Sequence, residues 1–372
     1  MDYEKAVKRS TGEVPVVEDV IDADSKKISW THNVKEDLRR LKPHKFEEGN
    51  IVTGLYRPFT KTRLYFNRRF NERVYQMPKI FPQPEIGNLA MSVSGVGASK
   101  GFSALLTDVV PNYHALDTGQ CFLLYYYDSA PADDLLRKSS DTGQVRRDAI
   151  TDTALSAFRK TYADNRSAAG TAGAGIGKED LFYYVYGILH SPEYKKRFAS
   201  DLKKQLPRIP YARDFWAFSL AGRQLADWHL NYEAVEPFPL QQSGELGLGD
   251  PALYRVQKMT FARSRANGKL TADKTTIIYN ARIRLSGIPL DTYDYIVNGK
   301  SALEWVMERY QMTTDKDSGI TNDPNDWATE HNDPQYILNL VKRVVRVSVE
   351  TVKIVNALPA LEELTVPVRQ RI

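Results

Sequence analysis

The hydrophobic pattern of the chain changes its period at a segment rich in glycine and alanine, residues 167–178 (SAAGTAGAGIGK). Before this segment, the apolar runs RLYF, LAMSVSG, SALLTDVV and CFLLYYY are short and separated by Gly, Pro and Asn, which is typical of β-strands. After it, Leu181, Val185 and Leu189 recur at every fourth residue, the spacing of one helix face. We therefore expect a β-rich subdomain and a helical subdomain, joined by a flexible connector.

The helical pattern continues as far as residue 235. Ser191-Pro192 is a helix-start signal, a capping serine followed by proline at the first helical position. A third helix is expected to carry a stripe that is more typical of a core than of a cofactor site: Phe215, Ala221, Leu225, Trp228 and Tyr232.

A second β region follows, with strands predicted at residues 253–261 and 276–285 around a turn that contains Asn267-Gly268. In the second strand, apolar and polar residues alternate with a period of two. Ser301 and Glu304 then form a capping box that opens a helix, and Asp333-Pro334 precedes a last helix. Many β-branched residues leave the extent of that last helix open.

These patterns predict an α+β protein with antiparallel strands. Residues 1–50 are expected to be an irregular lead-in with one helix near 34–41, capped by Asn33 and ended by Lys42-Pro43. The other predicted units are 51–165 (a β-rich recognition subdomain, with a polar helix at 148–162), 178–235 (a helical subdomain) and 250–372 (a second β region followed by C-terminal helices).

The composition is ordinary for a soluble globular protein of two or three domains, with 372 residues, 42% of them hydrophobic and 26% charged. The single cysteine, Cys121, excludes an intramolecular disulfide or a cysteine zinc cluster and is expected to be a small buried apolar residue. No run approaches the roughly 20 apolar residues of a membrane span, and no signal peptide is visible. The sequence therefore predicts a cytoplasmic protein with no membrane partner.

Residues 56–82 (YRPFTKTRLYFNRRFNERVYQMPKIFP) interleave seven cations and seven aromatic residues with one acid, Glu72. Such a strip suits a surface that meets a polyanion, because the cations neutralise phosphates. Duplex DNA offers few unstacked bases, so Tyr56, Phe59 and Phe66 are expected to position the strip by packing. The alternative is a half-buried hairpin whose charges are merely solvated.

Charge is segregated along the chain, although the net charge is only +5. Residues 56–79, 195–213 and 255–284 are strongly basic, whereas residues 315–333 are acidic. This pattern favours a basic face to which the three basic windows contribute, with an acidic region elsewhere.

The motifs of catalysis are missing from the sequence. The segment GTAGAGIGKED has Ala172 and Glu179 where a phosphate-binding loop needs glycine and a hydroxyl residue, so we interpret it as a linker. Lys100 likewise stands where a dinucleotide-binding turn would need its third glycine. The turn at 94–100 (SGVGASK) instead suits a phosphate contact on nucleic acid through its N–H groups, serine hydroxyls and lysine, or it is a plain glycine-rich hairpin turn. The six histidines show no metal-ligand spacing.

Long, ordered stretches of the chain resemble the C-terminal specificity region of Type ISP restriction–modification enzymes. They include YRPFTKTRLYFNRRFNERVYQMPKIFP, SVSGVGASKGFSALLTDVVPNYHALDTGQCFLLY, DLFYYVYGILHSPEYKKRFASDLKKQLPRIP, FWAFSLAGRQLADWHLNYE and YDYIVNGKSALEWVMERYQMTTDKDSGITNDPNDW. The resemblance covers about residues 28–360. It implies a domain that reads a short asymmetric DNA site for an attached adenine-N6 methyltransferase and a helicase/nuclease.

The motor, nuclease and methyltransferase motifs of that family are absent from this sequence, so the resemblance implies a specificity domain without catalysis or a cofactor of its own. Residues 1–50 would then lead in from an upstream methyltransferase-like region, either in the same polypeptide or in a partner subunit. A docking module for those partners is the alternative function, and a stand-alone nuclease is a third.

The main hypothesis is recognition of double-stranded DNA in the major groove, with β-strand loops contacting bases and helices contacting the backbone. Some of the candidate arginines are expected to pair with acids or support packing instead. The candidates fall into three groups: Arg57, Lys61, Arg63, Arg68, Arg69 and Arg73; then Ser94, Ser99 and Lys100; then Arg263, Arg265, Lys269, Arg282 and Arg284.

Overall fold

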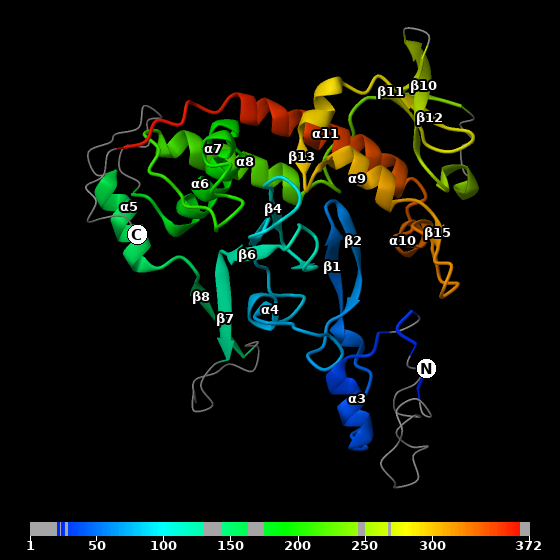
Figure 1. The fold of residues 1–372 in the computed structure, drawn as a ribbon, viewed down its shortest axis with the longest axis horizontal. Coiled ribbons are helices and arrows are strands. Elements are labelled where there is room, and N and C mark those ends of the chain that lie inside the picture. The colour runs from blue at the N-terminus through cyan, green and yellow to red at the C-terminus, as the bar shows by residue number, and fades with distance from the viewer. Residues whose placement is uncertain are drawn as a thin grey trace.

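The structure is a computed structural model that describes residues 21–364 except 23, 27–28, 130–142, 163–174, 245–249 and 267–268. It confirms a mixed α+β fold with several small sheets (Figure 1). Most of the connector at 167–178, the turn at Asn267-Gly268 and the first twenty residues lie outside the described residues.

The N-terminal β region contains two three-stranded sheets and one two-stranded sheet. Their strand orders are β2-β1-β5, β4-β3-β6 and β7-β8, and every pairing is antiparallel except the short β1–β5 pair. Each of the four predicted apolar runs contains a strand. The strands are β1 (Ile51–Arg57), β2 (Thr60–Tyr65), β3 (Ala90–Val93), β4 (Ala104–Thr107), β5 (Val110–Pro111), β6 (Gln120–Leu123), β7 (Tyr125–Ser129) and β8 (Gln144–Asp148).

Short helices flank this region. Helix α3 (His32–Arg39) begins earlier than predicted, because Thr31 and not Asn33 is its cap: the Thr31 hydroxyl accepts a hydrogen bond from the Val34 N–H. Helix α5 (Asp152–Thr161) begins later than predicted, because residues up to Asp148 belong to strand β8. The remaining pieces are η1 (Glu48–Asn50) and α4 (Met77–Ile80).

Three helices lie in the part of the chain where helices were predicted, with non-helical residues at 198–214 between the second and the third. They are α6 (Lys178–His190), α7 (Pro192–Arg197) and α8 (Phe215–Leu230). Ser191 caps α7 by accepting a hydrogen bond from the Tyr194 N–H, as the Ser-Pro signal predicted. Helices α6 and α8 lie together, and their aromatic side chains form one core with the inner faces of β3 and β4.

The second β region differs from the prediction at both strands. Residues 251–254 form a 3-10 helix, η2 (Pro251–Tyr254), so the predicted strand at 253–261 was wrong except at its last two residues. The predicted strand at 276–285 is a hairpin: β11 ends at Ile278 and β12 returns antiparallel, with Ile277 opposite Leu285. Its sheet has the order β10-β11-β12-β9, formed by β9 (Gln241–Ser243), β10 (Thr260–Ala266), β11 (Lys269–Ile278) and β12 (Arg284–Ser286).

The hairpin at 276–285 keeps the period of two because apolar residues of both strands face the same core. Ile277, Tyr279, Ile283 and Leu285 are all buried, whereas Ala281 is exposed at the turn. The Asn280 side chain closes this turn by accepting hydrogen bonds from the N–H groups of residues 282 and 283. An asparagine that bonds to its own backbone two or three residues on is a turn signal that competes with the strand pattern.

The C-terminal part is built around α11 (Tyr336–Asn356), the long helix that crosses the top of the molecule in Figure 1. Its first half is buried in a core with α9 and the second β region, and its last turns lie against the helical core. The capping box of Ser301 and Glu304 is confirmed at the start of α9. The elements are η3 (Leu290–Asp294), β13 (Ile296–Val297), β14 (Lys300–Ser301), α9 (Ala302–Arg309), β15 (Thr313–Thr314), β16 (Thr321–Asn322) and α10 (Asn325–Glu330).

Candidate nucleic-acid interface

The first basic group lies on the hairpin β1–β2 and on the irregular segment that follows it. Phe59 sits at the hairpin turn with a positive φ of 58°, is 1% exposed, and packs edge-on against Tyr232 at 5.2 Å between ring centroids. It therefore fixes the hairpin to the body, the packing role expected of it. Tyr56 is instead partly exposed, with the Arg57 guanidinium 4.2 Å from its ring centroid.

The cations on the hairpin itself form ion pairs or hydrogen bonds with other residues of the protein. The Lys61 ammonium lies 2.6 Å from a Glu233 carboxylate oxygen, and the lysine side chain is only 16% exposed. Arg63 contacts Glu330 at 3.2 Å and lies over the Trp327 ring, and Arg57 donates to the Asn112 side chain. These partners hold the cations against the body and reduce their availability to a ligand.

Two cations beyond the hairpin remain available to bind a ligand. Arg68 and Arg73 are exposed, and neither has a hydrogen bond or ion pair within the described part of the chain. Their neighbour Arg69 lies 3.7 Å from the buried Asp37 carboxylate, whose pKa is lowered by the His44 hydrogen bond and by the Arg69 charge, against the effect of burial. Arg68 and Arg73 are thus the members of the first group that best suit a phosphate or a base.

The turn at 94–100 does not offer an empty anion site. Ser94 is 4% exposed, and its hydroxyl accepts a hydrogen bond from the Ser103 N–H in the interior. The Ser99 hydroxyl and the N–H groups of Ser99 and Lys100 all donate to Asp117, and these hydrogen bonds lower the pKa of its carboxyl. The expected exposure is therefore wrong for Ser94, whereas Ser99 and Lys100 are exposed as expected but have these donors bonded to an internal carboxylate.

Lys100 nevertheless remains exposed at this turn, and the structure adds a neighbour that no motif predicted. The Gly97 N–H donates to the Lys203 carbonyl oxygen at 3.3 Å, which brings the second basic window beside the turn. Lys203 and Lys204 are both exposed. About a hundred residues separate the two segments, so only their packing reveals that they are neighbours.

The third group lies on the second β region. Arg263, Arg265 and Lys269 are exposed on the hairpin β10–β11, and Arg282 and Arg284 are exposed around the β11–β12 turn. Figure 1 shows β10–β11 projecting at the upper right, well away from β1–β2 in the centre and from α7. The three basic windows therefore do not gather in one patch and would contact a ligand at separate points.

The acidic window lies beside the first basic group, which corrects the expected segregation of charge. Together they line a cleft of about 740 Å³ between β1–β2 and the segments around α10. Arg63 pairs there with Glu330, and Arg255 pairs with Asp323 on the same acidic segment. Folding thus uses two acids of this segment to neutralise arginines.

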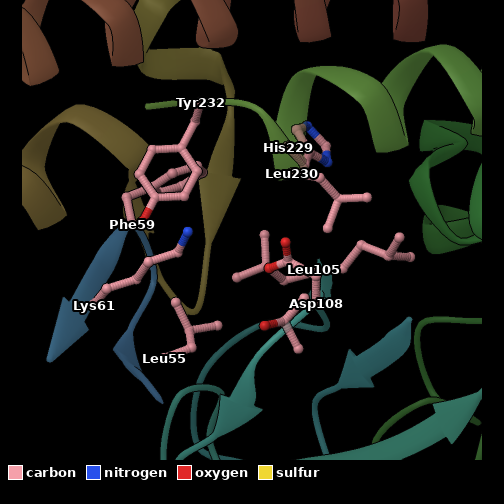
Figure 2. Close-up of a pocket in the computed structure, with 10 residues that line it drawn as sticks. Leu55, Phe59, Lys61, Leu105, Asp108, His229, Leu230 and Tyr232 are labelled. Carbon is pink, nitrogen blue, oxygen red and sulfur yellow. The ribbon is translucent and has the colours of Figure 1, made fainter. Parts of the chain in front are cut away.

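A small internal cavity lies behind the hairpin. Figure 2 shows Phe59 and Tyr232 on one side of it and Leu105 and Asp108 on the other. Its volume of about 10 Å³ suits a single water molecule and no larger ligand. This cavity is therefore a feature of the packing beneath the strip. Among the described residues, no group of three or more metal-ligating side chains is found, and no helix is long and apolar enough to span a membrane.

Comparisons with known proteins identify the family. The family model of the Type ISP C-terminal specificity domain matches residues 2–340. A nuclease-deletion mutant of the Type ISP enzyme LlaGI, solved with a DNA substrate mimic, shares 33% identity and a TM-score of 0.75 over 98% of this chain and 30% of that one. No curated protein matches the sequence.

Two further solved structures are similar to this chain. The ATP-dependent Type ISP enzyme LlaBIII bound to DNA is 32% identical with a TM-score of 0.77, over 97% of this chain and 21% of that one. A DrdV–DNA complex is 32% identical with a TM-score of 0.78, over 97% of this chain and 33% of that one. The chain thus spans between a fifth and a third of the length of the solved chains that it matches. The resemblance seen in the sequence is confirmed, and the chain belongs to the family of Type ISP C-terminal specificity domains.

Proposed function

We propose that this chain recognises a short sequence in double-stranded DNA and directs an adenine-N6 methyltransferase and a helicase/nuclease to it. The observation that carries the proposal is the match to the specificity-domain family over residues 2–340, together with the similarity to three enzymes solved with DNA. The chain would act in the cytoplasm as the recognition part of a larger enzyme, with no catalysis and no cofactor of its own.

The distribution of available cations supports this proposal. Exposed cations without an internal partner lie at separate points of the described surface: Arg68 and Arg73 after β2, Lys203 at the glycine-rich turn, and Arg263, Arg265 and Lys269 on β10–β11. Lys100 is also exposed at that turn, although its charge acts on the Asp117 carboxylate. A duplex is a long polyanion that can meet such separated points at once. We therefore retain these residues as DNA contacts and assign Lys61, Arg63 and Ser94 to support of the fold.

The test is binding of the purified chain to a pool of random DNA duplexes, followed by selection of the bound sequences. We expect enrichment of one short asymmetric motif, and an affinity for that motif that falls steeply with salt because counterions are released. Enrichment of no sequence would contradict recognition.

Substitution of the exposed arginines tests which residues take part. Arg68→Ala combined with Arg73→Ala is expected to weaken binding several-fold and to reduce the dependence of affinity on salt. The matched control is Arg223→Ala, because Arg223 is equally a surface arginine but pairs with Asp180 on the helical subdomain. Equal affinities for the double variant and the control would remove Arg68 and Arg73 from the interface.

A docking module for the methyltransferase or helicase remains the second candidate, because the matched chains are three to five times longer than this one. The last helix is a poor docking surface, since most of its length is buried in the core. Absence of DNA binding even at low salt, together with binding of the isolated chain to a methyltransferase partner, would favour docking.

A further inference from the structure

The hairpin β10–β11 contributes to no core over most of its length. Its outer part, residues 262–266 and 269–273, is a two-stranded ribbon, because β12 pairs with β11 only at residues 276–278. Residues 263–265 and 269–272 are all exposed, and no described residue of the ribbon belongs to a hydrophobic cluster. A two-stranded ribbon of this kind is marginally stable in water, so its presence calls for another explanation than packing.

The base of the ribbon is firmly anchored. Between Phe261 and Ala262 the register shifts, and this bulge places Lys274 against the body. The Lys274 ammonium lies 3.1 Å from Glu304 and 4.6 Å from the centroid of the Tyr293 ring, and the Tyr293 hydroxyl donates to the Lys274 carbonyl at 2.6 Å. A bulge bends a hairpin and sets its direction. The fold thus holds the ribbon pointing away from the body, as Figure 1 shows.

The pairing of β10 with β11 decides which side chains share a face of the ribbon. Arg263 lies opposite Ala272 and Arg265 lies opposite Leu270, so these four side chains share one face. Ser264 and Thr271 are paired on the other face. The first face carries two arginines without partners among the described residues, and Leu270, which is 57% exposed opposite Arg265.

The charge of the ribbon favours a polyanion. Its only acid, Asp273, accepts hydrogen bonds from the N–H and hydroxyl groups of Thr275, which lower the pKa of its carboxyl. Arg263, Arg265 and Lys269 are opposed by no other acid on the ribbon.

The dimensions of the ribbon suit the major groove of DNA. Two paired strands lie about 4.8 Å apart, and the five residues from Ala262 to Ala266 extend the ribbon by roughly 16 Å at about 3.3 Å per residue. The major groove of B-DNA, about 12 Å wide and 8.5 Å deep, admits such a ribbon as it stands, whereas the minor groove, about 6 Å wide, would first have to be opened by bending of the duplex. Arginine suits guanine O6 and N7 in the major groove, and an apolar side chain suits the thymine methyl group.

We propose that the ribbon of residues 262–266 and 269–273 enters the major groove of the target duplex with its Arg263, Arg265 and Leu270 face toward the base edges. This assignment rests on the proposed function and names the element that reads the sequence. The opposite face, with Ser264 and Thr271, points away from the bases, and Lys269 contacts the phosphate backbone.

The experiment compares the full chain with substitutions on the two faces. The wild-type chain is first used to select a motif from random duplexes, and Arg263→Ala, Arg265→Ala and Leu270→Ala are then compared with Ser264→Ala and Thr271→Ala. All five side chains are exposed, so every variant is expected to fold, which circular dichroism checks. We expect each arginine variant to lose about tenfold or more of its discrimination at one base pair, whereas Ser264→Ala and Thr271→Ala keep the wild-type preference.

Modified DNA gives a second readout. Replacement of a recognised guanine by 7-deazaguanine removes the N7 acceptor from the major groove and should weaken wild-type binding. It should have no further effect on the arginine variant that has lost discrimination at that position, because the contact is then already missing.

The outcomes separate the two proposals. If the wild-type chain selects no motif, both the proposed function and the ribbon assignment fail. If it selects a motif and the arginine variants keep both affinity and preference, only the ribbon assignment is overturned. It is also overturned if the arginine variants weaken binding equally at all sequences, which indicates phosphate contacts, or if the Ser264 and Thr271 face carries the preference.

Discussion

At the scale of single residues, the basic strip contains two kinds of cation that the sequence does not distinguish. Lys61 is largely enclosed, and its partner Glu233 also accepts a hydrogen bond from the Tyr336 hydroxyl. Arg68 is exposed without a partner in the described part of the chain. The first arrangement stabilises the fold, whereas the second leaves a charge available to a ligand.

Substitution should separate these two roles. We expect Lys61→Ala to lower the free energy of unfolding by about 1–3 kcal/mol, because it leaves the partly buried Glu233 carboxylate without its cation. Arg68→Ala is expected to change stability by no more than about 0.5 kcal/mol. Urea denaturation measures both.

A double-mutant cycle isolates the ion pair from other effects of truncation. Lys61→Ala and Glu233→Ala together should cost less than the sum of the single changes by about 1 kcal/mol, because the two side chains are in contact. Strictly additive costs would show that the pair contributes nothing, and Lys61 would return to the group of candidate DNA contacts.

At the scale of elements, the packing of α6 against α8 depends on a close approach of the two helices at two glycines. A Cβ atom at Gly187 would lie 2.1 Å from the Phe218 carbonyl oxygen, and one at Gly222 would lie 1.8 Å from that of Tyr183. Both distances are far below van der Waals contact, so any larger residue forces the helices apart. This explains why glycine stands inside two helices where it weakens the local propensity.

Gly222→Ala should therefore destabilise the protein although alanine is the better helix former by about 1 kcal/mol. We expect a net loss of roughly 2–3 kcal/mol in the free energy of unfolding, from overpacking at the helix contact. Gly101→Ala is the control, because no atom lies within 4 Å of a Cβ placed there. A neutral or stabilising effect of Gly222→Ala would contradict the close helix contact.

At the scale of the whole molecule, a buried hydrogen-bond network joins the β region to the helices. The Tyr186 hydroxyl of α6 accepts from the Leu106 N–H of β4 and lies 2.6 Å from His229 Nδ1 of α8. His229 Nε2 in turn lies 2.9 Å from the Thr351 hydroxyl of α11. A neutral His229 with its proton on Nε2 satisfies both bonds. Its Nδ1 then accepts from the Tyr186 hydroxyl, and its Nε2–H donates to the Thr351 hydroxyl.

Burial keeps His229 uncharged, together with its neighbour His190, whose Nδ1 lies 2.9 Å from the Tyr186 carbonyl oxygen. Burial lowers the pKa of His190 to about 3, with a further contribution from the Lys195 charge, and lowers the pKa of His229 well below its ordinary value. In the unfolded chain both histidines should titrate near pH 6.5. Above that pH they are neutral in both states, and below it only the unfolded chain binds the protons, so the folded state loses stability as the pH falls.

We therefore expect the free energy of unfolding to fall between pH 6.5 and pH 5 with a slope approaching 1.4 kcal/mol per pH unit for each buried histidine. His190→Gln should reduce this slope, whereas His114→Gln, at an exposed position, should leave it unchanged. The slope is compared rather than the absolute stability, because any change in the core lowers the latter. Identical slopes for the wild-type protein and His190→Gln would contradict the assignment.

Local sequence patterns predicted much of the fold correctly. The four N-terminal apolar runs, the helices on both sides of Ser191, the capping box at Ser301 and the last helix all follow from signals contained within a few residues. One prediction failed because two local signals competed. At residues 276–285 the alternation indicated one strand, and the Asn280 turn divided it into two.

The sequence by itself determined the α+β class, the family and the residues that are candidates for DNA contact, because periodicity, caps and family motifs are carried by neighbouring residues. Only the tertiary structure decided which cations remain available. Lys61 meets Glu233 across 172 positions, Arg63 meets Glu330 across 267, and Asp117 meets the glycine-rich turn through a loop. The physical reason is that an ion pair depends on distance in space, which a pattern of neighbouring residues does not contain.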